Sequence, residues 1–250
     1  MTMAQRIRGI LFDLGDTLLD FGQINVPRLF YAGAELAYAF LRRLEQPVPD
    51  FHKYHRRQLW AVRWNYLKSR LTGREFNSLD LMARIGRRFG QDLTDEQMLE
   101  LAWLWYKPLG KTATVERGLG QMLTELRAEG LKLAVVSNTF VPAGVLDRHL
   151  EQEGLLEHLP VRVYSSDVGY RKPNRRIFDE ALGRCGLEAG EAMFVGDSPW
   201  ADIFGAKRMG MVSVLKDPAG RHRHIRIRPH YRIRSILKLP RILRRSNGEG

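Results

Sequence analysis

The sequence predicts an α/β protein with a doubly wound, mostly parallel, Rossmann-like sheet and an inserted all-helical domain. Short apolar runs that indicate buried strands alternate with segments of helical periodicity, which is typical of a parallel sheet covered on both faces. A block at about residues 20–112 contains helical patterns only. Polar side chains follow the predicted strands directly, at the position where open α/β sheets bind their ligands.

The first predicted strand is the apolar segment over residues 7–12, which ends abruptly in acidic residues. An apolar run of this length bounded by glycine predicts a buried strand. It is followed by Asp13, Gly15, Asp16 and Thr17. A carboxylate at the end of a buried strand costs free energy unless a cation, hydrogen bonds or a chemical role compensates. Asp13 is therefore a candidate functional residue, although an ordinary strand-to-loop junction with solvated acids has the same local pattern.

The helical block divides the predicted core into residues 1–19 and 113–250, so that residues 20–112 form an inserted domain. Apolar residues at helical spacing predict helices in this block, at residues 29–44, 52–71, 77–89 and 95–106. Thr94 and Gln97 form a capping-box pattern, in which a hydroxyl is followed by an amide three residues later. The aromatic residues of the block either line a substrate pocket or form the core of the inserted domain, and the second arrangement is the commoner one. These residues are Trp60, Trp64, Trp103, Trp105 and Tyr106.

Two small hydrogen-bonding side chains end the second predicted strand. A helical pattern over residues 116–129 stops at Gly130, and an apolar strand begins at Leu131. This strand runs straight into Ser137 and Asn138. Either side chain can donate a hydrogen bond to a ligand oxygen. Ser137 taken alone is also explained as an ordinary strand terminus.

A lysine lies between the third predicted strand and the next helix. Residues 161–164 predict the strand, and residues 174–185 predict a helix that ends at Gly186. Lys172 stands directly before Pro173. Proline restricts the preceding residue to extended geometry and suits the first turn of a helix. Lys172 is either solvated, as most lysines are, or held as a cation at the sheet edge.

A second acidic cluster ends the next predicted strand. The strand over residues 193–196 leads into Asp197, a helix opens near Pro199, and Asp202 lies about one turn into that helix. A further strand is predicted at residues 211–215. Asp202 alone has an ordinary explanation, because acids favour the positive end of a helix. Because the carboxyl ends of parallel strands lie at one edge of a sheet, all these polar clusters are expected to converge.

The ordered set of motifs resembles that of the haloacid dehalogenase-like superfamily of hydrolases. That family carries an aspartate after its first strand, a Ser or Thr ending the second, a Lys before a helix, and an acidic Gly-Asp…Asp pair. This chain presents them in order as Asp13, Ser137, Lys172, Asp197 and Asp202. The resemblance spans about residues 5–215, and residues 229–243 are similar to the family's last strand and helix. Four ordered motifs at predicted strand ends and helix starts are a far more specific signal than one Asp-x-x-Asp pair.

The resemblance implies a phosphomonoester hydrolase that uses Mg²⁺, acts on a small phosphorylated metabolite and closes a mobile helical cap over its site. A carboxylate attacking a phosphate dianion meets like-charge repulsion, which a metal ion reduces, and Mg²⁺ prefers hard oxygen ligands. By resemblance, Asp13 is the nucleophile and forms an aspartyl-phosphate. The implied metal ligands are Asp13, the Gly15 carbonyl, Asp197 and Asp202. The implied phosphoryl-binding residues are Ser137, with the adjacent Asn138, and Lys172.

One position departs from the phosphatase pattern of this superfamily. Its phosphatases usually carry a second aspartate two positions after the nucleophile, as general acid and base. This chain has Gly15 there, with Asp16 one residue later. A shift of one residue in an extended turn points a side chain the other way. Asp16 therefore either takes part through a distorted turn or only caps the turn. In the second case, water replaces the missing acid at a reduced rate, or the enzyme favours substrates with good leaving groups.

Two alternatives stay open beside the phosphatase. A 2-haloacid dehalogenase-type hydrolase would use Asp13 to displace halide through an ester without a metal. Enzymes of that kind tend to lose the first acid of the last motif, whereas Asp197 is present here. A catalytically weak domain that serves as a binding module is the second alternative, and among the motif positions only Gly15 favours it. Metal-dependent phosphate release, halide release or neither would separate the three hypotheses.

The composition fits a core with one insertion. A chain of 250 residues with 44% hydrophobic residues suffices for a substantial core. The single cysteine, Cys185, excludes intramolecular disulfides and fits a reducing cytosol. No apolar stretch approaches the roughly 20 residues of a membrane span, and the short N-terminal apolar run ends in acids, unlike a signal peptide. We therefore expect a cytoplasmic protein without a transmembrane segment, whose oligomeric state is open.

The C-terminal segment is strongly basic. Residues 216–250 contain 11 Lys or Arg against Asp217 and Glu249, so most of the chain's formal net charge of +12 lies there. Over residues 221–234, arginines and isoleucines alternate at strand period, so that one face can pack while arginines face water. The segment either completes the core or forms an anion-binding patch for nucleic acid, acidic lipid or a polyphosphorylated substrate. Without an accompanying nucleic-acid-binding module, nucleic acid is the less expected partner.

Overall fold

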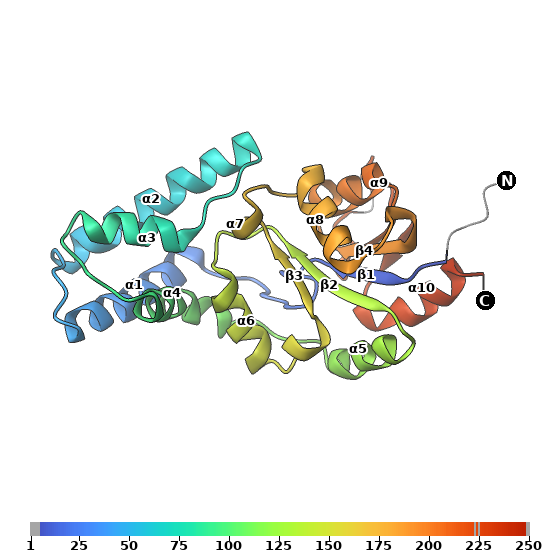
Figure 1. Ribbon diagram of the computed structural model, residues 1–250, viewed down its shortest axis with the longest axis horizontal. Helices are drawn as coiled ribbons and strands as arrows, with labels where there is room; N and C mark the ends of the chain where they lie inside the picture. The colour runs from blue at the N-terminus through green and yellow to red at the C-terminus, as the bar shows by residue number, and fades with distance from the viewer. Residues whose placement is uncertain (1–5, 223, 225, 249–250) are drawn as a thin grey trace.

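The computed structural model, which describes residues 6–222, 224 and 226–248, places an α/β core beside a layer of helices (Figure 1). One six-stranded parallel sheet contains β1 (Gly9–Phe12), β2 (Lys132–Ser137), β3 (Val161–Tyr164), β4 (Ala192–Gly196), β5 (Val212–Lys216) and β6 (Tyr231–Ile233). The strand order is β3-β2-β1-β4-β5-β6, and every neighbouring pair is parallel. The predicted doubly wound α/β class is confirmed.

The strand order creates a topological switch point between β1 and β4. The chain moves outward from β1 through β2 and β3, and then returns to the other side of β1 with β4. The connections after β1 and β4 therefore leave in opposite directions, which opens a crevice at the carboxyl edge of the sheet. Asp13 and Asp197 directly follow these two strands. The topology alone thus brings the two acidic motifs to the position where such sheets bind ligands.

Helices cover both faces of the sheet (Figure 1). One face carries α5 (Leu119–Ala128), α6 (Ala143–Gln152) and α10 (Leu239–Ser246), and the other carries α8 (Arg175–Cys185) and α9 (Gly205–Met209). Ile10 and Phe12 of β1 pack into the first apolar layer, whereas Leu11 packs into the second. This burial on both faces explains why the central strands β1 and β4 are continuous apolar runs. The shorter elements are α7 (Ser165–Val168), η1 (Leu156–His158), η2 (Ala189–Glu191), the π-helical turn η3 (Pro199–Phe204) and η4 (Ile236–Lys238).

The helices between β1 and α5 form a separate layer, here called the helical insertion (Figure 1). It consists of α1 (Val26–Arg43), α2 (Phe51–Thr72), α3 (Ser78–Arg87) and α4 (Asp95–Gly110). Its apolar core is distinct from the two layers on the sheet and includes Ala37, Leu41 and Tyr54. Each helix predicted in this block is present. Thr94 and Gln97 cap α4 reciprocally, with hydrogen bonds of 3.2 and 3.0 Å.

Three segments differ from the sequence prediction. Helix α6 was not predicted, and α5 begins later than expected because Gly118 precedes it with a left-handed φ of 95°. The alternation over residues 221–234 yields only the short β6, and positions 223 and 225 lie outside the described residues. Asp217 accepts hydrogen bonds from the main-chain nitrogens of Arg221 and His222 at 2.8 and 3.2 Å, which folds this part into a turn instead.

Across the part of the chain that the structure describes, no helix combines the length and apolar character required to cross a bilayer.

Candidate active site

A cavity of about 690 Å³ opens at the carboxyl edge of the sheet. The structure brings together on its wall every site residue predicted from the sequence: Asp13, Gly15, Asp16, Ser137, Asn138, Lys172, Asp197 and Asp202. Residues that the sequence did not single out also line it: Ser69, Arg70 and Gly73 at the end of α2, and Trp200 and Arg208 after β4. The cavity thus lies between the α/β core and the helical insertion.

Three aspartates converge at the base of this cavity. Asp13, Asp197 and Asp202 each place a carboxylate oxygen within 4.8 Å of the others. Asp13 and Asp202 are buried, with exposed fractions of 8% and 1%. The main-chain nitrogen of Asp13 donates to the Val195 carbonyl of β4 at 2.8 Å, which fixes the end of β1 beside β4. Carboxylates at this separation need a compensating cation if all three are to be ionised together.

The turn after β4 holds Asp202 against the strand. Asp202 Oδ2 accepts a hydrogen bond from the main-chain nitrogen of Ser198 at 2.9 Å. A Cβ atom on Gly196 would lie 2.3 Å from the same oxygen, so only glycine allows this close approach. The Gly-Asp of the motif is therefore explained physically, because the glycine leaves room for the second aspartate.

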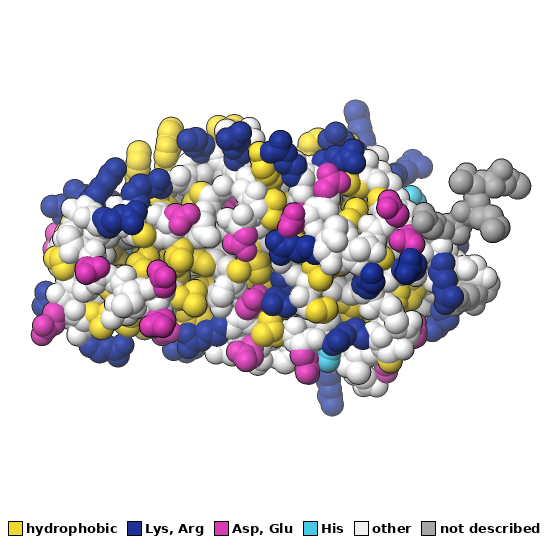
Figure 2. Space-filling model, viewed as in Figure 1, with side chains coloured by type: hydrophobic (Ala, Val, Ile, Leu, Met, Phe, Trp, Pro, Cys, Tyr) yellow, Lys and Arg dark blue, Asp and Glu magenta, His cyan; other side chains and the backbone are white. Residues whose placement is uncertain are grey.

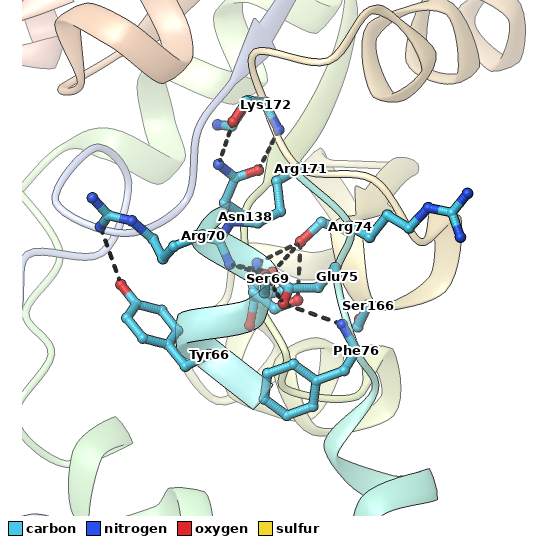
Figure 3. Close-up of polar contacts among 12 residues, drawn as sticks. Tyr66, Ser69, Arg70, Arg74, Glu75, Phe76, Asn138, Ser166, Arg171 and Lys172 are labelled. Carbon is cyan, nitrogen blue, oxygen red and sulfur yellow. Dashed lines mark hydrogen bonds and ion pairs between the residues drawn. The ribbon is translucent and has the colours of Figure 1, made fainter. Parts of the chain in front are cut away.

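Lys172 supplies the cation inside this cluster. Its Nζ donates to Asp13 Oδ1 at 2.6 Å and to the Val136 carbonyl at 2.7 Å, and it forms an ion pair with Asp202 Oδ1 at 2.8 Å. The side chain is 1% exposed. Asn138 grips the main chain of Lys172, since its Oδ1 accepts from Lys172 N at 2.6 Å and its Nδ2 donates to Lys172 O at 3.0 Å (Figure 3). Asn138 therefore orients the lysine, and its predicted contact with substrate stays a prediction.

The protonation equilibria reflect this crowding. Burial raises the pKa of Asp13 to about 6, against the opposing effect of the Lys172 ammonium. Burial, together with the charges of Asp13 and Asp202, raises the pKa of Asp197 to about 8. Burial opposes the charge on Lys172, but the carboxylates of Asp13 and Asp202 outweigh it and raise the pKa of the ammonium. The lysine is thus charged at neutral pH, and the aspartates need more positive charge to ionise fully.

The residues present fit a divalent cation. One ammonium faces the three carboxylates of Asp13, Asp197 and Asp202, so the cluster lacks positive charge. Asp202 Oδ1 is buried and accepts no hydrogen bond of good geometry from the described residues. A hard oxygen donor set of this kind is what Mg²⁺ binds, with water and substrate oxygens completing its shell. The cluster has the donors and the charge deficit that such an ion would satisfy.

Asp16 lies on the cavity wall through an unusual backbone conformation. Its φ of 56° is left-handed, which aspartate tolerates better than most residues. The expectation that a shift of one residue points the side chain away assumed an extended turn, and this turn is not extended. Asp16 Oδ1 also accepts a hydrogen bond from the main-chain nitrogen of Phe21 at 3.2 Å. The side chain therefore caps its turn and borders the cavity at the same time.

A second polar network, which the sequence did not reveal, joins the helical insertion to the core (Figure 3). The Glu75 side chain, in the segment between α2 and α3, is completely buried. It accepts hydrogen bonds from Ser69 Oγ at 2.8 Å and from Ser165 Oγ at 3.0 Å, and it pairs with Arg171. Ser165 Oγ in turn accepts from the main-chain nitrogen of Thr139 at 2.8 Å. Glu75 thus connects the insertion to the loops that carry Asn138 and Lys172.

Replacing Glu75 by Gln is expected to lower the free energy of unfolding by about 2 kcal/mol, because the largely buried Arg171 guanidinium loses its charged acceptor. Chemical denaturation measures the change. The matched control is Glu100→Gln, which removes another ion pair between insertion and core, to Arg148 at 2.6 Å, whose partners are 39% and 44% exposed. That variant should lose less than about 1 kcal/mol. Equal effects of the two substitutions would contradict the role given to Glu75.

The aromatic residues of the insertion divide differently from expectation. Trp103 and Tyr106 are buried in the apolar layer next to the sheet. Trp105 and Tyr106 line a separate apolar cavity of about 210 Å³ beside the Phe140 loop. Trp60 and Trp64 belong to neither place, since they are 68% and 56% exposed. These two tryptophans therefore lie neither in a substrate pocket nor in the core of the insertion, the two places that the sequence predicted for them.

The comparison with protein families decides what kind of protein carries this site. Residues 7–210 match the family model described as a haloacid dehalogenase-like hydrolase. The chain belongs to the haloacid dehalogenase-like hydrolase family. A relative named haloacid dehalogenase-like hydrolase domain-containing protein 3 is 43% identical in Mus musculus over 108 residues, covering 42% of this chain and 40% of the mouse protein. The Homo sapiens protein of the same name is 31% identical over 226 residues, covering 85% of this chain and 84% of its own length.

Solved structures of the family share the fold described above. The structure of a HAD phosphatase from Thermococcus onnurineus has a TM-score of 0.59 and 28% identity, and the match covers 95% of this chain and 98% of that chain. A 2-haloacid dehalogenase from Pseudomonas syringae has a TM-score of 0.66 at 24% identity, covering 96% and 99%. Phosphoserine phosphatase of Thermus thermophilus is 38% identical over 98 residues, 38% of this chain and 37% of that enzyme. Membership of the family is therefore clear, whereas phosphatases and a dehalogenase both occur among the similar proteins.

Proposed function

We propose that this family member is a Mg²⁺-dependent phosphomonoester hydrolase that acts on a small phosphorylated substrate. The observation that carries the proposal is the buried Asp13 carboxylate, held 2.6 Å from the Lys172 ammonium, with Asp197 and Asp202 close enough to share a cation. A dehalogenase has no need of this acidic cluster. The similar phosphatases from T. onnurineus and T. thermophilus support the same choice.

In the proposed reaction an Asp13 carboxylate oxygen attacks the phosphorus atom and the bond from phosphorus to the leaving oxygen breaks. The Lys172 ammonium and the Ser137 hydroxyl would donate hydrogen bonds to the phosphoryl oxygens. These bonds would stabilise the negative charge on the phosphoryl group in the transition state. The leaving oxygen takes up a proton, for which Asp16 is the proposed donor. Water then attacks the phosphorus atom of the aspartyl-phosphate and gives up a proton, for which the Asp16 carboxylate is again the proposed group. The bond from phosphorus to the Asp13 oxygen breaks, which releases phosphate and restores the Asp13 carboxylate.

Asp13, Asp197, Asp202 and the Gly15 carbonyl would hold the Mg²⁺ ion. When bound, the ion would supply the positive charge that lets an anionic nucleophile approach an anionic substrate. The carboxylates must be deprotonated to bind it. The helical insertion, at residues 20–112, is proposed as the cap that selects the substrate, because Ser69, Arg70 and Gly73 of its α2 end form part of the cavity wall.

Release of inorganic phosphate from an aryl phosphate, measured with Mg²⁺ and with EDTA, tests the proposal directly. Metal-dependent phosphate release is expected. Halide release from a 2-haloacid without added metal would favour the dehalogenase hypothesis instead, and the absence of both products would favour a binding module. A panel of phosphorylated metabolites then identifies the substrate.

Binding of Mg²⁺ is also expected to raise the melting temperature more at about pH 8.5 than at about pH 6. Asp13 and Asp197 have pKa values raised to about 6 and about 8 in the folded protein, well above those of ordinary carboxyls. Their stabilising contribution is therefore complete only at low pH, and the metal-free protein loses it as the pH rises through these values. Mg²⁺ binds the ionised carboxylates and reverses the loss. Thermal unfolding at both pH values, with and without the ion, measures the effect, and an equal shift would contradict it.

Replacing Asp16 by Asn is expected to lower kcat by about 10²-fold for an alkyl phosphate, since general acid catalysis typically contributes this much or more. Hydrolysis of p-nitrophenyl phosphate should fall far less, because its phenolate leaves without needing a proton. Asn keeps an oxygen for the hydrogen bond from Phe21 N, so the turn is preserved. A loss of the same size on both substrates would make Asp16 a structural residue only.

A further inference from the structure

Helix α2 (Phe51–Thr72) carries an apolar stripe on the face opposite to its packed one. The packed face is fixed by Tyr54, Gln58 and Ser69, all buried. The outward stripe recurs at intervals of three and four residues and consists of Trp60, Trp64, Leu67 and Leu71, with exposed fractions of 68%, 56%, 51% and 78%. Residues at these spacings lie on one side of a helix. A continuous apolar row of this length on the outside of a protein usually marks an interaction site.

Basic side chains border the stripe on both sides. At 100° per residue, Arg56, Arg63 and Arg70 fall along one border and Arg57 and Lys68 along the other, and all of them are exposed. Along the upper edge of Figure 2, over α2, hydrophobic and dark blue side chains project next to one another. In the described part of the chain none of these cations pairs with a carboxylate of another residue. The helix thus presents an apolar centre between two positive margins.

The charge of α2 identifies the partner. Its 22 residues contain no Asp or Glu. A second copy of the chain packed symmetrically, with its own α2 against this face, would bring two sets of like charges together, which is unfavourable. An anionic lipid surface offers negative headgroups to the margins and an acyl boundary to the tryptophans and leucines.

The geometry of the aromatic pair disfavours nucleic acid. The rings of Trp60 and Trp64 stack on each other, with centroids 6.0 Å apart and an angle of 9° between their planes. At this spacing a base does not fit between the two rings, and the stripe continues in aliphatic Leu67 and Leu71, which offer bases no stacking platform. Bilayer-binding helices, in contrast, combine tryptophan with leucine in this way.

The stripe also leads toward the catalytic cavity. Arg70, the last residue of one basic margin, lines that cavity together with Trp200. Trp200 is itself 58% exposed and stacks on Phe204 with centroids 4.4 Å apart. A surface bound along α2 would therefore lie next to the cavity mouth.

We propose that α2 is a peripheral membrane-docking helix that binds the surface of anionic bilayers through Trp60, Trp64, Leu67 and Leu71, flanked by its arginines and Lys68. This inference does not depend on the proposed phosphatase activity. Docking on the surface needs neither a membrane-spanning segment nor a change in the α/β core.

Co-sedimentation of the full chain with vesicles tests the proposal. Vesicles of phosphatidylcholine with about 30 mol% phosphatidylserine should bind the protein, and phosphatidylcholine alone should bind it much more weakly, because anionic lipid attracts the basic margins. Trp60→Ser combined with Trp64→Ser should weaken binding by about tenfold or more. Trp60→Leu combined with Trp64→Leu should retain binding yet lose most of the tryptophan quenching by lipids with brominated acyl chains. Circular dichroism shows that each variant is folded.

The charge requirement has a matched control. A triple variant of the basic margins should weaken binding by about fivefold for each charge removed. It combines Arg56→Gln, Arg63→Gln and Lys68→Gln. The control triple variant removes as many charges from the exposed side of α10 and should leave binding nearly unchanged. It combines Arg241→Gln, Arg244→Gln and Arg245→Gln. Three results would overturn the proposal. They are equal losses of binding in the two triple variants, undiminished binding by the variant with Trp60→Ser and Trp64→Ser, and no binding of the wild type to anionic vesicles. So would a dimer, or an RNA complex, that the same tryptophan variant abolishes.

Discussion

Replacing Asp13 by Asn is expected to reduce phosphate release by at least roughly 10³-fold, because the substitution removes the proposed nucleophile. The asparagine amide has the same shape but no negative charge, and it cannot form the acyl-phosphate. Quenching the reaction with acid should trap a phosphorylated protein from the wild type and none from the variant. Release of phosphate is measured under the Mg²⁺ conditions that are optimal for the wild type.

The same variant should not unfold, which separates lost chemistry from lost structure. Burial and the Asp202 carboxylate both disfavour the charge on Asp13, so its removal relieves repulsion in the metal-free protein. We expect a melting temperature equal to that of the wild type or higher. Asp179→Asn, on the exposed side of α8, is the matched control and should retain full activity. Phosphate release by Asp13→Asn within about tenfold of the wild type would exclude Asp13 as the nucleophile.

The sheet and the core of the site follow from local patterns in the sequence. The central strands β1 and β4 are short apolar runs because both of their faces are covered, and this pattern is visible without a structure. The convergence of these polar residues is then a consequence of parallel topology. Asp13 and Asp197 follow β1 and β4, Ser137 ends β2, and Lys172 lies on the connection after β3, all at one edge of the sheet. The prediction needed no knowledge of side-chain contacts.

Contacts between distant segments could not be predicted in this way. Glu75 belongs to no motif, and its partner Arg171 lies 96 residues away in sequence. Arg171 stands next to Lys172, which is the only local signal that it lies near the site. The left-handed backbone of Asp16 is equally invisible, because periodicity arguments assume regular strand or helix geometry.

Helix α2 shows a different limit of sequence analysis. Its apolar residues occupy two opposite faces. One face packs against the rest of the protein, and the other is exposed. A helix that is apolar on several sides ordinarily predicts burial. The expectation that Trp60 and Trp64 lie in a pocket or a core follows instead from the usual burial of large aromatic side chains. Only the packing of α2 against its neighbours shows which of the two faces is covered.

Replacing Lys172 by Met is expected to lower kcat/KM by about 10²- to 10³-fold, because a preorganised charge beside the phosphoryl group is lost. The substitution should also move the acidic limb of the pH profile to higher pH. The Lys172 ammonium lowers the pKa of Asp13, which burial raises to about 6. Without the ammonium, Asp13 stays protonated to higher pH, and the fraction of enzyme with an ionised nucleophile falls. The pH dependence of kcat/KM, measured on one substrate at saturating Mg²⁺, records this shift.

Lys216→Met provides the matched control, because Lys216 is also buried at a strand end. Its Nζ donates to the Thr17 carbonyl and to Asp20 Oδ2, both at 3.0 Å, and its side chain does not line the catalytic cavity. Lys172→Met should lose about 3–5 kcal/mol of stability, because it leaves buried carboxylates without their partner. Lys216→Met should lose less, because its partner Asp20 is 43% exposed. Only Lys172→Met should shift the acidic limb, because only Lys172 contacts Asp13. If both variants kept the wild-type pH profile, Lys172 would be a structural cation, and the ionisation of Asp13 would depend on the bound metal instead.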